Sequence, residues 1–424
     1  MKNRVVVTGL GIVAPNGVGL EAFQAALKNG KSGIRYISQL NELNFGCQVA
    51  GVPEDVDTIS EDYFTEEQLM AMNSNIKFAS IAAIDAWKDA GLPVSKPDSD
   101  EVDWDAGAII GTGIGGMDTI GEKVVPLINS GKVRRLGSTA VEQIMASGIS
   151  AKISGFLALG NQVTTNSSAC STGTEAIIDA MYRVRNGLAK RMLAGGSEGA
   201  VSYIWGGFDA MRVLNRTRND EPGKASRPMS ASAAGFVPGS GAGVLLLESL
   251  ECAQERGARI YAEIIGGAIN CGGHRMGGSM TAPNPVGVQK CIQAALADAG
   301  INGEQVDAIN GHLTATFADP YEVKNWSKAL GRSPEDFPMI NSTKSLVGHC
   351  LGAAGGIESV ACVLQIYNGF VHGSVNCEDL HEEIKPFANS VVHETRSAPE
   401  LKIQAKASFG FGDVNACIIF KKWE

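Results

Sequence analysis

The sequence of 424 residues lacks several features that would each define a class of protein. No apolar stretch approaches the roughly 18 residues of a membrane span, and the N-terminal apolar run is too short and too glycine-rich for a signal peptide. Positive charge is not in excess, because the formal net charge is −9. We therefore expect a soluble, cytoplasmic protein that binds neither membranes nor nucleic acid.

Metal-binding and disulfide motifs are missing as well. The nine cysteines are odd in number and form no CxxC pair, and HExxH and calcium-loop spacings are absent. Reduced thiols, without a metal site or a disulfide framework, are the expectation.

Glycine is abundant instead, with 52 residues, while apolar and charged residues stand at the ordinary 44% and 19%. Patterns typical of strands alternate with helical patterns along the chain, which predicts an α/β fold. The strand patterns cover residues 4–8, 108–110, 191–194 and 244–248, and the helical patterns cover residues 65–90 and 285–299.

The two halves of the chain share a pattern. Glycine-rich helix starts recur at residues 170–173 and 352–355, and each precedes a helix with one apolar stripe. We infer a duplicated fold with halves 1–255 and 256–424, in which both helix starts face a common centre.

Cys170 lies in the segment Ser-Ser-Ala-Cys-Ser-Thr-Gly, at a predicted strand-to-helix turn. The dipole of a helix N-terminus favours a thiolate, and backbone N–H groups there can hold an oxyanion. This setting indicates a nucleophile. The alternative is a packed structural cysteine, which is the commoner role of cysteines in general.

Two histidines lie in similar glycine-rich turns. His312 follows a short apolar strand, where side chains commonly face a ligand crevice, and His349 lies three residues before Gly352. Together with Cys170 they form the candidate site. For the remaining histidines we expect structural or surface roles: His274, His372, His381 and His393.

Residues 111–116 and 9–14 fit a dinucleotide-binding glycine pattern or its alanine variant. Neither is followed about 20 residues later by a clear strand that ends in an acidic residue, so we expect no nucleotide cofactor. Packing of these backbones beside a substrate channel is the better interpretation. Basic residues gather at 132–135 and 212–218, where a solvated face and a docking patch for an acidic partner both remain open.

These motifs together resemble the β-ketoacyl-acyl-carrier-protein synthases, especially the elongating type II enzymes. The resemblance implies the thiolase fold, with two similar mixed-sheet halves in a five-layer α-β-α-β-α arrangement, usually as a homodimer. It spans nearly the whole chain and is carried, in family order, by residues 7–13, 167–173, 194–198, 310–312, 342–355 and 408–412.

The resemblance also implies roles for single residues. Cys170 matches the acyl-accepting nucleophile, His312 and His349 match the catalytic histidine pair, Lys344 matches the lysine of the same site, and Glu358 matches a supporting helix glutamate.

Further matches concern the substrate channel. Phe411 matches the gating phenylalanine, whose N–H forms the oxyanion hole with that of Cys170. Thr314 and Thr316 match hydroxyls that contact the phosphopantetheine arm, and Ile114 matches a residue of the acyl pocket.

The implied reaction is a decarboxylative Claisen condensation of malonyl-carrier protein with an acyl group held on Cys170. No redox or metal cofactor is implied. The partner would be an acidic acyl carrier protein, and Arg212, with Arg216 nearby, falls where the family often docks it. A specialised polyketide or aryl-polyene synthase is the alternative within the fold. A non-condensing partner subunit is a weaker alternative, because loss of the nucleophile would mark such a protein.

Several positions depart from the family pattern. Leu313 replaces a glycine, Asp319 arrives one residue early, and Ala233-Ala234 stand in place of Arg-Asp. Asp413-Val414 replace Gly-Thr, and Glu66-Glu67 stand where a basic segment is common. Acyl chain length, gating and carrier contacts therefore do not follow from the resemblance.

Overall fold

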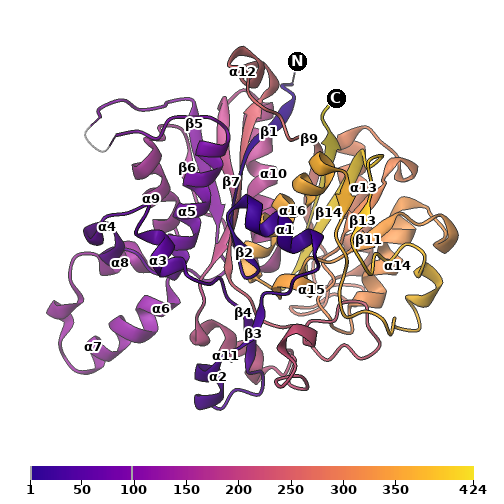
Figure 1. Ribbon diagram of the computed structural model, residues 1–424, viewed down its shortest axis with the longest axis horizontal. Coiled ribbons are helices and arrows are strands. Elements are labelled where there is room, and N and C mark those ends of the chain that lie inside the picture. The colour runs from indigo at the N-terminus through magenta and orange to yellow at the C-terminus, as the bar shows by residue number, and fades with distance from the viewer. Residues whose placement is uncertain (1, 97–98) are drawn as a thin grey trace.

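A computed structural model describes residues 2–96 and 99–424 (Figure 1). The strands of its main sheet are β1 (Val5–Ala14), β2 (Gly17–Val18), β5 (Ala106–Gly111), β6 (Val163–Thr164), β7 (Arg191–Glu198), β8 (Gly241–Ser249), β9 (Ala262–Cys271), β10 (Ala308–Asn310), β11 (Met339–Asn341), β14 (Ile403–Gly410) and β15 (Val414–Lys422). Two small sheets pair β3 (Ile34–Tyr36) with β4 (Val49–Gly51) and β12 (Phe370–Val371) with β13 (Arg396–Ser397).

The main sheet runs in the order β11-β10-β14-β15-β9-β1-β8-β7-β5-β6, and β2 pairs with β1. From the centre outward, the sheet consists of two series of strands, β1-β8-β7-β5-β6 and β9-β15-β14-β10-β11. Each series has two antiparallel pairings followed by two parallel ones. Among the strands of the described residues, the two series pair with each other only where Val5–Val7 meets Ala262–Ile264. The repeated order supports a duplicated fold. The boundary after residue 255 remains a prediction, and it lies between α12 (Leu250–Glu255) and β9.

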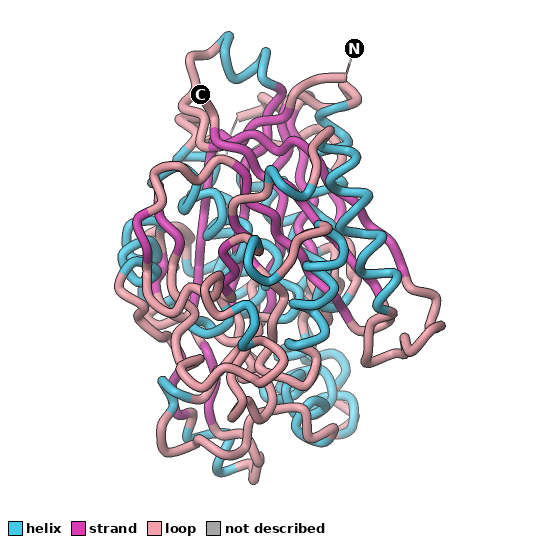
Figure 2. The backbone as a smooth tube through the Cα atoms, turned by 90° about the vertical axis from the view of Figure 1, so that its right-hand side faces the viewer, coloured by secondary structure: helices cyan, strands magenta, loops and turns pink. Residues whose placement is uncertain are grey.

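Helices cover and separate the two series of strands (Figures 1 and 2). The central pair is α10 (Thr172–Arg185) and α16 (Ala354–Asn368), which pack on each other and on strands of both series. On the outer faces lie α5 (Ser74–Asp89) and α9 (Gly148–Leu157) on one side, and α13 (Pro285–Ala299) and α14 (Asp319–Leu330) on the other. The resulting order α-β-α-β-α confirms the predicted five-layer α/β architecture.

The remaining α-helices are short and lie in connections. They are α1 (Leu20–Lys28), α2 (Ser38–Glu42), α3 (Val56–Ser60), α4 (Glu66–Met70), α6 (Met117–Thr119), α7 (Val125–Asn129), α8 (Ala140–Ile144), α11 (Ser202–Ala210) and α15 (Lys344–Val347). Among the described residues, no helix combines the length and the apolar character needed to cross a membrane.

The helix predicted over residues 285–299 is confirmed, whereas the single helix predicted over 65–90 is wrong. Two helices occupy that region, α4 and α5. Thr65 caps α4 in a reciprocal box with Gln68, and the Asn73 side chain accepts from the Ile76 N–H at the start of α5. Each cap fixes a new helix start, so the chain breaks between them.

Candidate active site

Cys170 stands where the two central helices begin. It lies in a single 3-10 turn, Ala169–Ser171, which leads into α10, and Ala169 has a left-handed φ of 50°. The backbone of Phe411 hydrogen-bonds the Cys170 thiol. A Cβ at Gly410 would lie 3.1 Å from Cys170 N, so a larger residue there would require the nucleophile turn or β14 to shift by a few tenths of an ångström.

His349 reaches Cys170 from the second half of the chain. Its Nε2 lies 3.1 Å from Cys170 Sγ. Its Nδ1 accepts a hydrogen bond of 3.2 Å from the Leu351 N–H, so the ring proton is on Nε2. His349 therefore presents a neutral N–H donor to the sulfur.

His312 completes the group at the end of β10. Its ring centroid lies 5.3 Å from that of His349, and a donor atom from each of the three residues lies within 4.8 Å of the other two. The Glu322 carboxylate accepts from the N–H groups of His312 at 2.6 Å and Leu313 at 2.7 Å. Backbone hydrogen bonds thus fix the position from which the His312 side chain projects.

The ionisation of these groups follows from their burial. Desolvation lowers the pKa of His312 and of His349 well below the ordinary value, and the nearby Lys344 ammonium adds to the effect. Burial raises the pKa of Cys170 to about 11, although Lys344 and the Phe411 N–H oppose this. Both histidines are therefore neutral at neutral pH. The thiol, rather than the thiolate expected from the sequence, is the resting form of Cys170, because desolvation outweighs the opposing effects of Lys344 and the Phe411 N–H on its pKa.

A buried cluster of charged side chains lies near Cys170 and the two histidines. Lys344 hydrogen-bonds Glu358 Oε1, and Lys406 Nζ lies 3.0 Å from Glu358 Oε2. All three side chains are buried. The structure thus places Lys344 and Glu358 together, as expected, and adds Lys406, which the sequence did not indicate.

The donor set of Cys170 and the two histidines resembles that of a zinc site. A metal at His349 Nε2 would move the ring proton to Nδ1, where it would face the Leu351 N–H. Two ammonium groups nearby, Lys344 and Lys406, also lower the pKa of both rings and would repel a cation. These contacts suit hydrogen-bond donation by the rings rather than metal coordination.

The predicted gate is part of a row of aromatic rings. The Phe411 ring lies 6.0 Å from that of Phe208, which lies 5.5 Å from Phe236, and Phe236 lies 5.2 Å from the His349 ring. Phe411 thus lies at the end of this row of rings, and its role as a gate remains a prediction.

The remodelled loop after His312 is held by a buried acid. Asp319 begins α14 and accepts from the N–H groups of Thr314 at 2.9 Å and Ala315 at 3.1 Å. The Thr314 and Thr316 hydroxyls lie 3.0 Å apart, half-buried, as a pair. Leu313, in place of the usual glycine, is fully buried in an apolar cluster.

The glycine pattern at residues 111–116 has a role other than nucleotide binding. Its N–H groups at Gly113 and Ile114 donate to the buried Glu198 carboxylate, which also accepts from the Gly352 N–H at 2.9 Å. A pyrophosphate would need those same N–H groups. Glu198 therefore ties this loop to the start of α16. The Ile114 side chain is 46% exposed, so its role in an acyl pocket remains a prediction.

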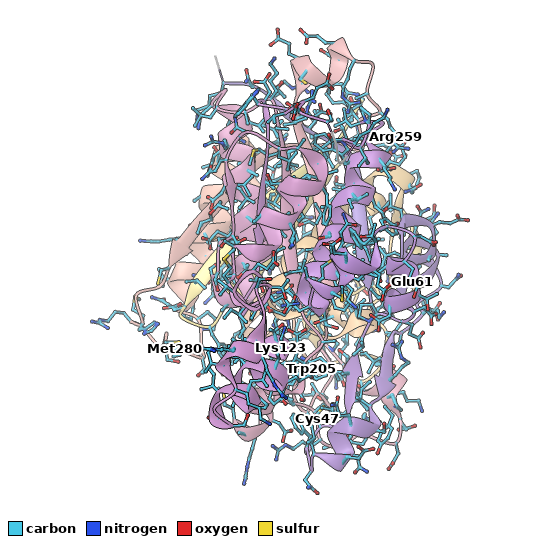
Figure 3. The ribbon with its side chains drawn as sticks, turned by 90° about the vertical axis from the view of Figure 1, so that its left-hand side faces the viewer. Cys47, Glu61, Lys123, Trp205, Arg259 and Met280 are labelled. Carbon is cyan, nitrogen blue, oxygen red and sulfur yellow. The ribbon has the colours of Figure 1, made fainter. Side chains whose placement is uncertain are left out.

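Residues 132–135 of the first basic segment are exposed, whereas the arginines of the second segment, 212–218, differ in how their charges are used. Arg216 forms an ion pair with Asp209 at 3.0 Å. Asp209 also accepts a hydrogen bond from the Cys47 N–H, and Cys47 belongs to the same apolar cluster as Trp205 of α11 (Figure 3). Arg218 pairs with Glu221. Arg212 is exposed at the end of α11, the helix that carries Phe208. Arg212 is thus better placed for docking than Arg216, whose charge holds the local fold.

Comparison with known proteins gives a consistent result. Residues 2–253 match the family model described as "Beta-ketoacyl synthase, N-terminal domain", and residues 261–378 match "Beta-ketoacyl synthase, C-terminal domain". The 3-oxoacyl-[acyl-carrier-protein] synthase 2 of Vibrio cholerae is 36% identical over 425 residues, which cover 99% of each chain.

Solved structures agree over the full length of the chain. A β-ketoacyl synthase from Burkholderia phymatum has a TM-score of 0.89 at 28% identity and covers 100% of both chains. A type II polyketide ketosynthase bound to a hexaketide, in complex with its acyl-carrier protein, has a TM-score of 0.87 at 30% identity with the same coverage.

Proposed function

This chain belongs to the β-ketoacyl synthase family, and we propose that it elongates fatty acyl chains by decarboxylative condensation with malonyl-carrier protein. It is a β-ketoacyl-acyl-carrier-protein synthase, an acyltransferase of fatty acid biosynthesis. The observation that carries the proposal is the 3.1 Å approach of His349 Nε2 to Cys170 Sγ, with His312 beside them.

In the first half-reaction, Cys170 takes the acyl group. Its sulfur loses the thiol proton and attacks the thioester carbonyl of acyl-carrier protein, while the N–H groups of Cys170 and Phe411 stabilise the oxyanion. The C–S bond to the carrier breaks, and the carrier thiolate leaves and takes up a proton. Donation from His349 Nε2 and the Phe411 N–H favours the reactive thiolate over the resting thiol.

In the second half-reaction, malonyl-carrier protein occupies the site. Its C–C bond breaks and releases carbon dioxide, and the electron pair passes to an enolate oxygen. The acylated sulfur no longer needs the His349 proton, so both histidine Nε2–H groups are available to stabilise this oxygen. The enolate carbon then attacks the carbonyl of the Cys170 thioester, and the bond from this carbon to the Cys170 sulfur breaks. The β-ketoacyl-carrier product leaves two carbons longer, and the Cys170 thiolate takes up a proton.

The supporting roles are proposals as well. Thr314 and Thr316 contact the phosphopantetheine arm, Ile114 lines the acyl pocket, and Phe411 acts as the gate. The partner is an acyl carrier protein, which the similar polyketide ketosynthase also binds. Arg212 is the docking residue that the geometry favours. A homodimer and a cytoplasmic location remain predictions from the sequence.

The alternative function shares the chemistry and differs in the acyl chain. A polyketide ketosynthase holding a hexaketide is among the similar structures, so a specialised acceptor is the second candidate. Incubation with malonyl-carrier protein and acyl-carriers of graded length, read by mass spectrometry, separates the two. A non-condensing subunit is disfavoured, because the nucleophile and both donors are assembled.

The site assignment is tested by separating the half-reactions. Cys170→Ala should abolish both the acyl adduct and condensation. His312→Ala and His349→Ala should still allow the Cys170 adduct but slow malonyl decarboxylation by about 10²–10³, the usual effect of losing an oxyanion donor. Intact-mass measurement and carbon dioxide release report the two steps. An adduct on another cysteine, or unchanged decarboxylation in both histidine variants, would refute the assignment.

A further inference from the structure

We propose that Lys406 is a positioning residue of this site, whose buried ammonium shares the Glu358 carboxylate with Lys344 and leaves one net positive charge beside the histidines. Lys406 lies on β14, four residues before Gly410. The inference rests on the proposed function, because it concerns the two histidine donors.

The charges of the cluster do not balance. Lys344 hydrogen-bonds one oxygen of Glu358, and Lys406 Nζ lies 3.0 Å from the other. The side chains of Lys344, Lys406 and Glu358 are 2%, 0% and 1% exposed, so water does not screen them. Two ammonium groups against one carboxylate leave a positive field that favours anionic states in the site.

Lys406 keeps its proton because each of the three N–H groups of its ammonium has a hydrogen-bond acceptor. An ammonium has three N–H groups, and Lys406 Nζ donates to Thr174 Oγ1 at 2.8 Å, to the Ala407 carbonyl at 3.2 Å and to Ser408 Oγ. Desolvation lowers the pKa of Lys406, and Glu358 opposes this. The three acceptors replace the water that burial removed.

The same contacts connect Lys406 to the nucleophile. Thr174 lies in the first turn of α10, four residues after Cys170, and its hydroxyl lies 2.9 Å from Ser408 Oγ. The Ser171 hydroxyl donates to the Ser408 carbonyl at 3.2 Å. Lys406 thus links the start of the Cys170 helix to the charge cluster.

The positive field acts on the state of the histidines. Desolvation is the largest cause of the low pKa of His312 and His349, and Lys344 and Lys406 both add to it. If His349 were protonated, its Nδ1–H would face the Leu351 N–H and the ring would be displaced. Lys406 therefore keeps the ring neutral and in the orientation that donates from Nε2.

Other ionisable groups near the site come from several elements, and their charges either oppose the positive field of the cluster or add to it. They are Glu358 on α16, Glu322 on α14, Glu198 on β7 and the Cys170 thiol before α10.

The test compares variants that remove the charge with one that removes only a contact. Lys406→Met and Lys406→Gln remove the charge, and the glutamine keeps hydrogen-bonding capacity. Thr174→Val keeps the charge and removes one acceptor. Carbon dioxide release from malonyl-carrier protein is measured from pH 5.5 to 8, with melting temperature and Cys170 acylation as measures of folding.

For the wild type we expect the rate to vary over this range only through Glu322, whose pKa is about 7, and this variation should be common to all the variants. In both Lys406 variants the histidine pKa should rise, while desolvation and Lys344 still hold it below its ordinary value. The rate at pH 5.5 should therefore fall, relative to that at pH 8, more than in the wild type, with about tenfold as the limit for a histidine whose pKa reaches 6.5. Thr174→Val should lower the rate equally at all pH values.

The inference is overturned if a folded Lys406 variant keeps the wild-type pH profile, or if Thr174→Val shifts the profile as much. It is also overturned if neither Lys406 variant folds, because the residue is then only structural. Absence of decarboxylation by the wild type would instead refute the proposed function.

Discussion

Gly173→Ala probes the close contact between the two central helices. Gly173 lies three residues after Cys170, and a Cβ there would lie 2.6 Å from Gly356 N and 3.0 Å from the Gly352 carbonyl oxygen. Ordinary contact begins near 3.4 Å, so α10 and α16 must separate by about 0.8 Å.

This separation acts directly on the site, because each helix start carries part of it. A displacement of about 1 Å between reacting groups can reduce a rate about 10²-fold, so we expect a loss of that order in condensation. Overpacking costs about 1–3 kcal/mol, and replacing a helical glycine with alanine offsets up to about 1 kcal/mol. The variant should therefore fold with slightly reduced stability.

Gly155→Ala is the matched control. Gly155 lies within α9, is exposed, and has no atom within 4 Å of its added Cβ. This control should keep full activity and gain up to about 1 kcal/mol in unfolding free energy. The assay is the rate of β-ketoacyl-carrier formation, with intact mass to follow the Cys170 adduct. If Gly173→Ala stays within twofold of the wild-type rate, the helix contact does not set the site geometry.

Two further predictions concern pH and docking. Burial raises the pKa of Glu322 to about 7, so its protonation stabilises the fold fully below about pH 4.5, and this stabilisation is lost as pH rises through 7. Between pH 5 and 8, the unfolding free energy of the wild type, measured by urea titration, should fall by about 2.5 kcal/mol more than that of Glu322→Gln. Equal dependence of the unfolding free energy on pH in the two proteins would contradict this. Arg212→Glu should raise KM for acyl-carrier protein but not for a small acyl thioester, and about 0.5 M salt should reduce the difference. Arg216→Glu should lower the melting temperature instead, because it breaks the pair with Asp209; equal effects on both thioesters would remove Arg212 from docking.

Local patterns predicted the α/β class, the duplication and the candidate group of Cys170, His312 and His349, whereas the five-layer arrangement was implied by the family resemblance. Glycine-rich helix starts mark the positions of Cys170 and His349, and the repeat brings them together. The strand predicted to end at residue 8 continues instead to Ala14. Gly9 and Gly11 lie inside it, because a Cβ at either position would collide with the backbone of α5.

The missed residues depend on long-range contacts. Lys406 lies in a strand, where a lysine usually indicates a solvated face, and no spacing relates it to Glu358. Glu198 belongs to a motif that carries the family resemblance, but no sequence pattern indicates its hydrogen bonds to two loops that are distant in the sequence. The shift in the Cys170 pKa likewise arises from burial by several elements, so no local pattern indicates it.

The narrow join between β1 and β9 has a consequence for how the enzyme reaches its active state. Cys170 and His349 are 179 residues apart in sequence, and they come from the parts of the chain that contain β1 to β8 and β9 to β15, respectively. During synthesis, the Cys170 segment emerges long before its two donors exist. Secondary structure can form in the first part early, but the nucleophile meets its partners only after the second part docks. On refolding, decarboxylation of malonyl-carrier protein should therefore return after helical content does, which makes carbon dioxide release a chemical reporter of the last folding step.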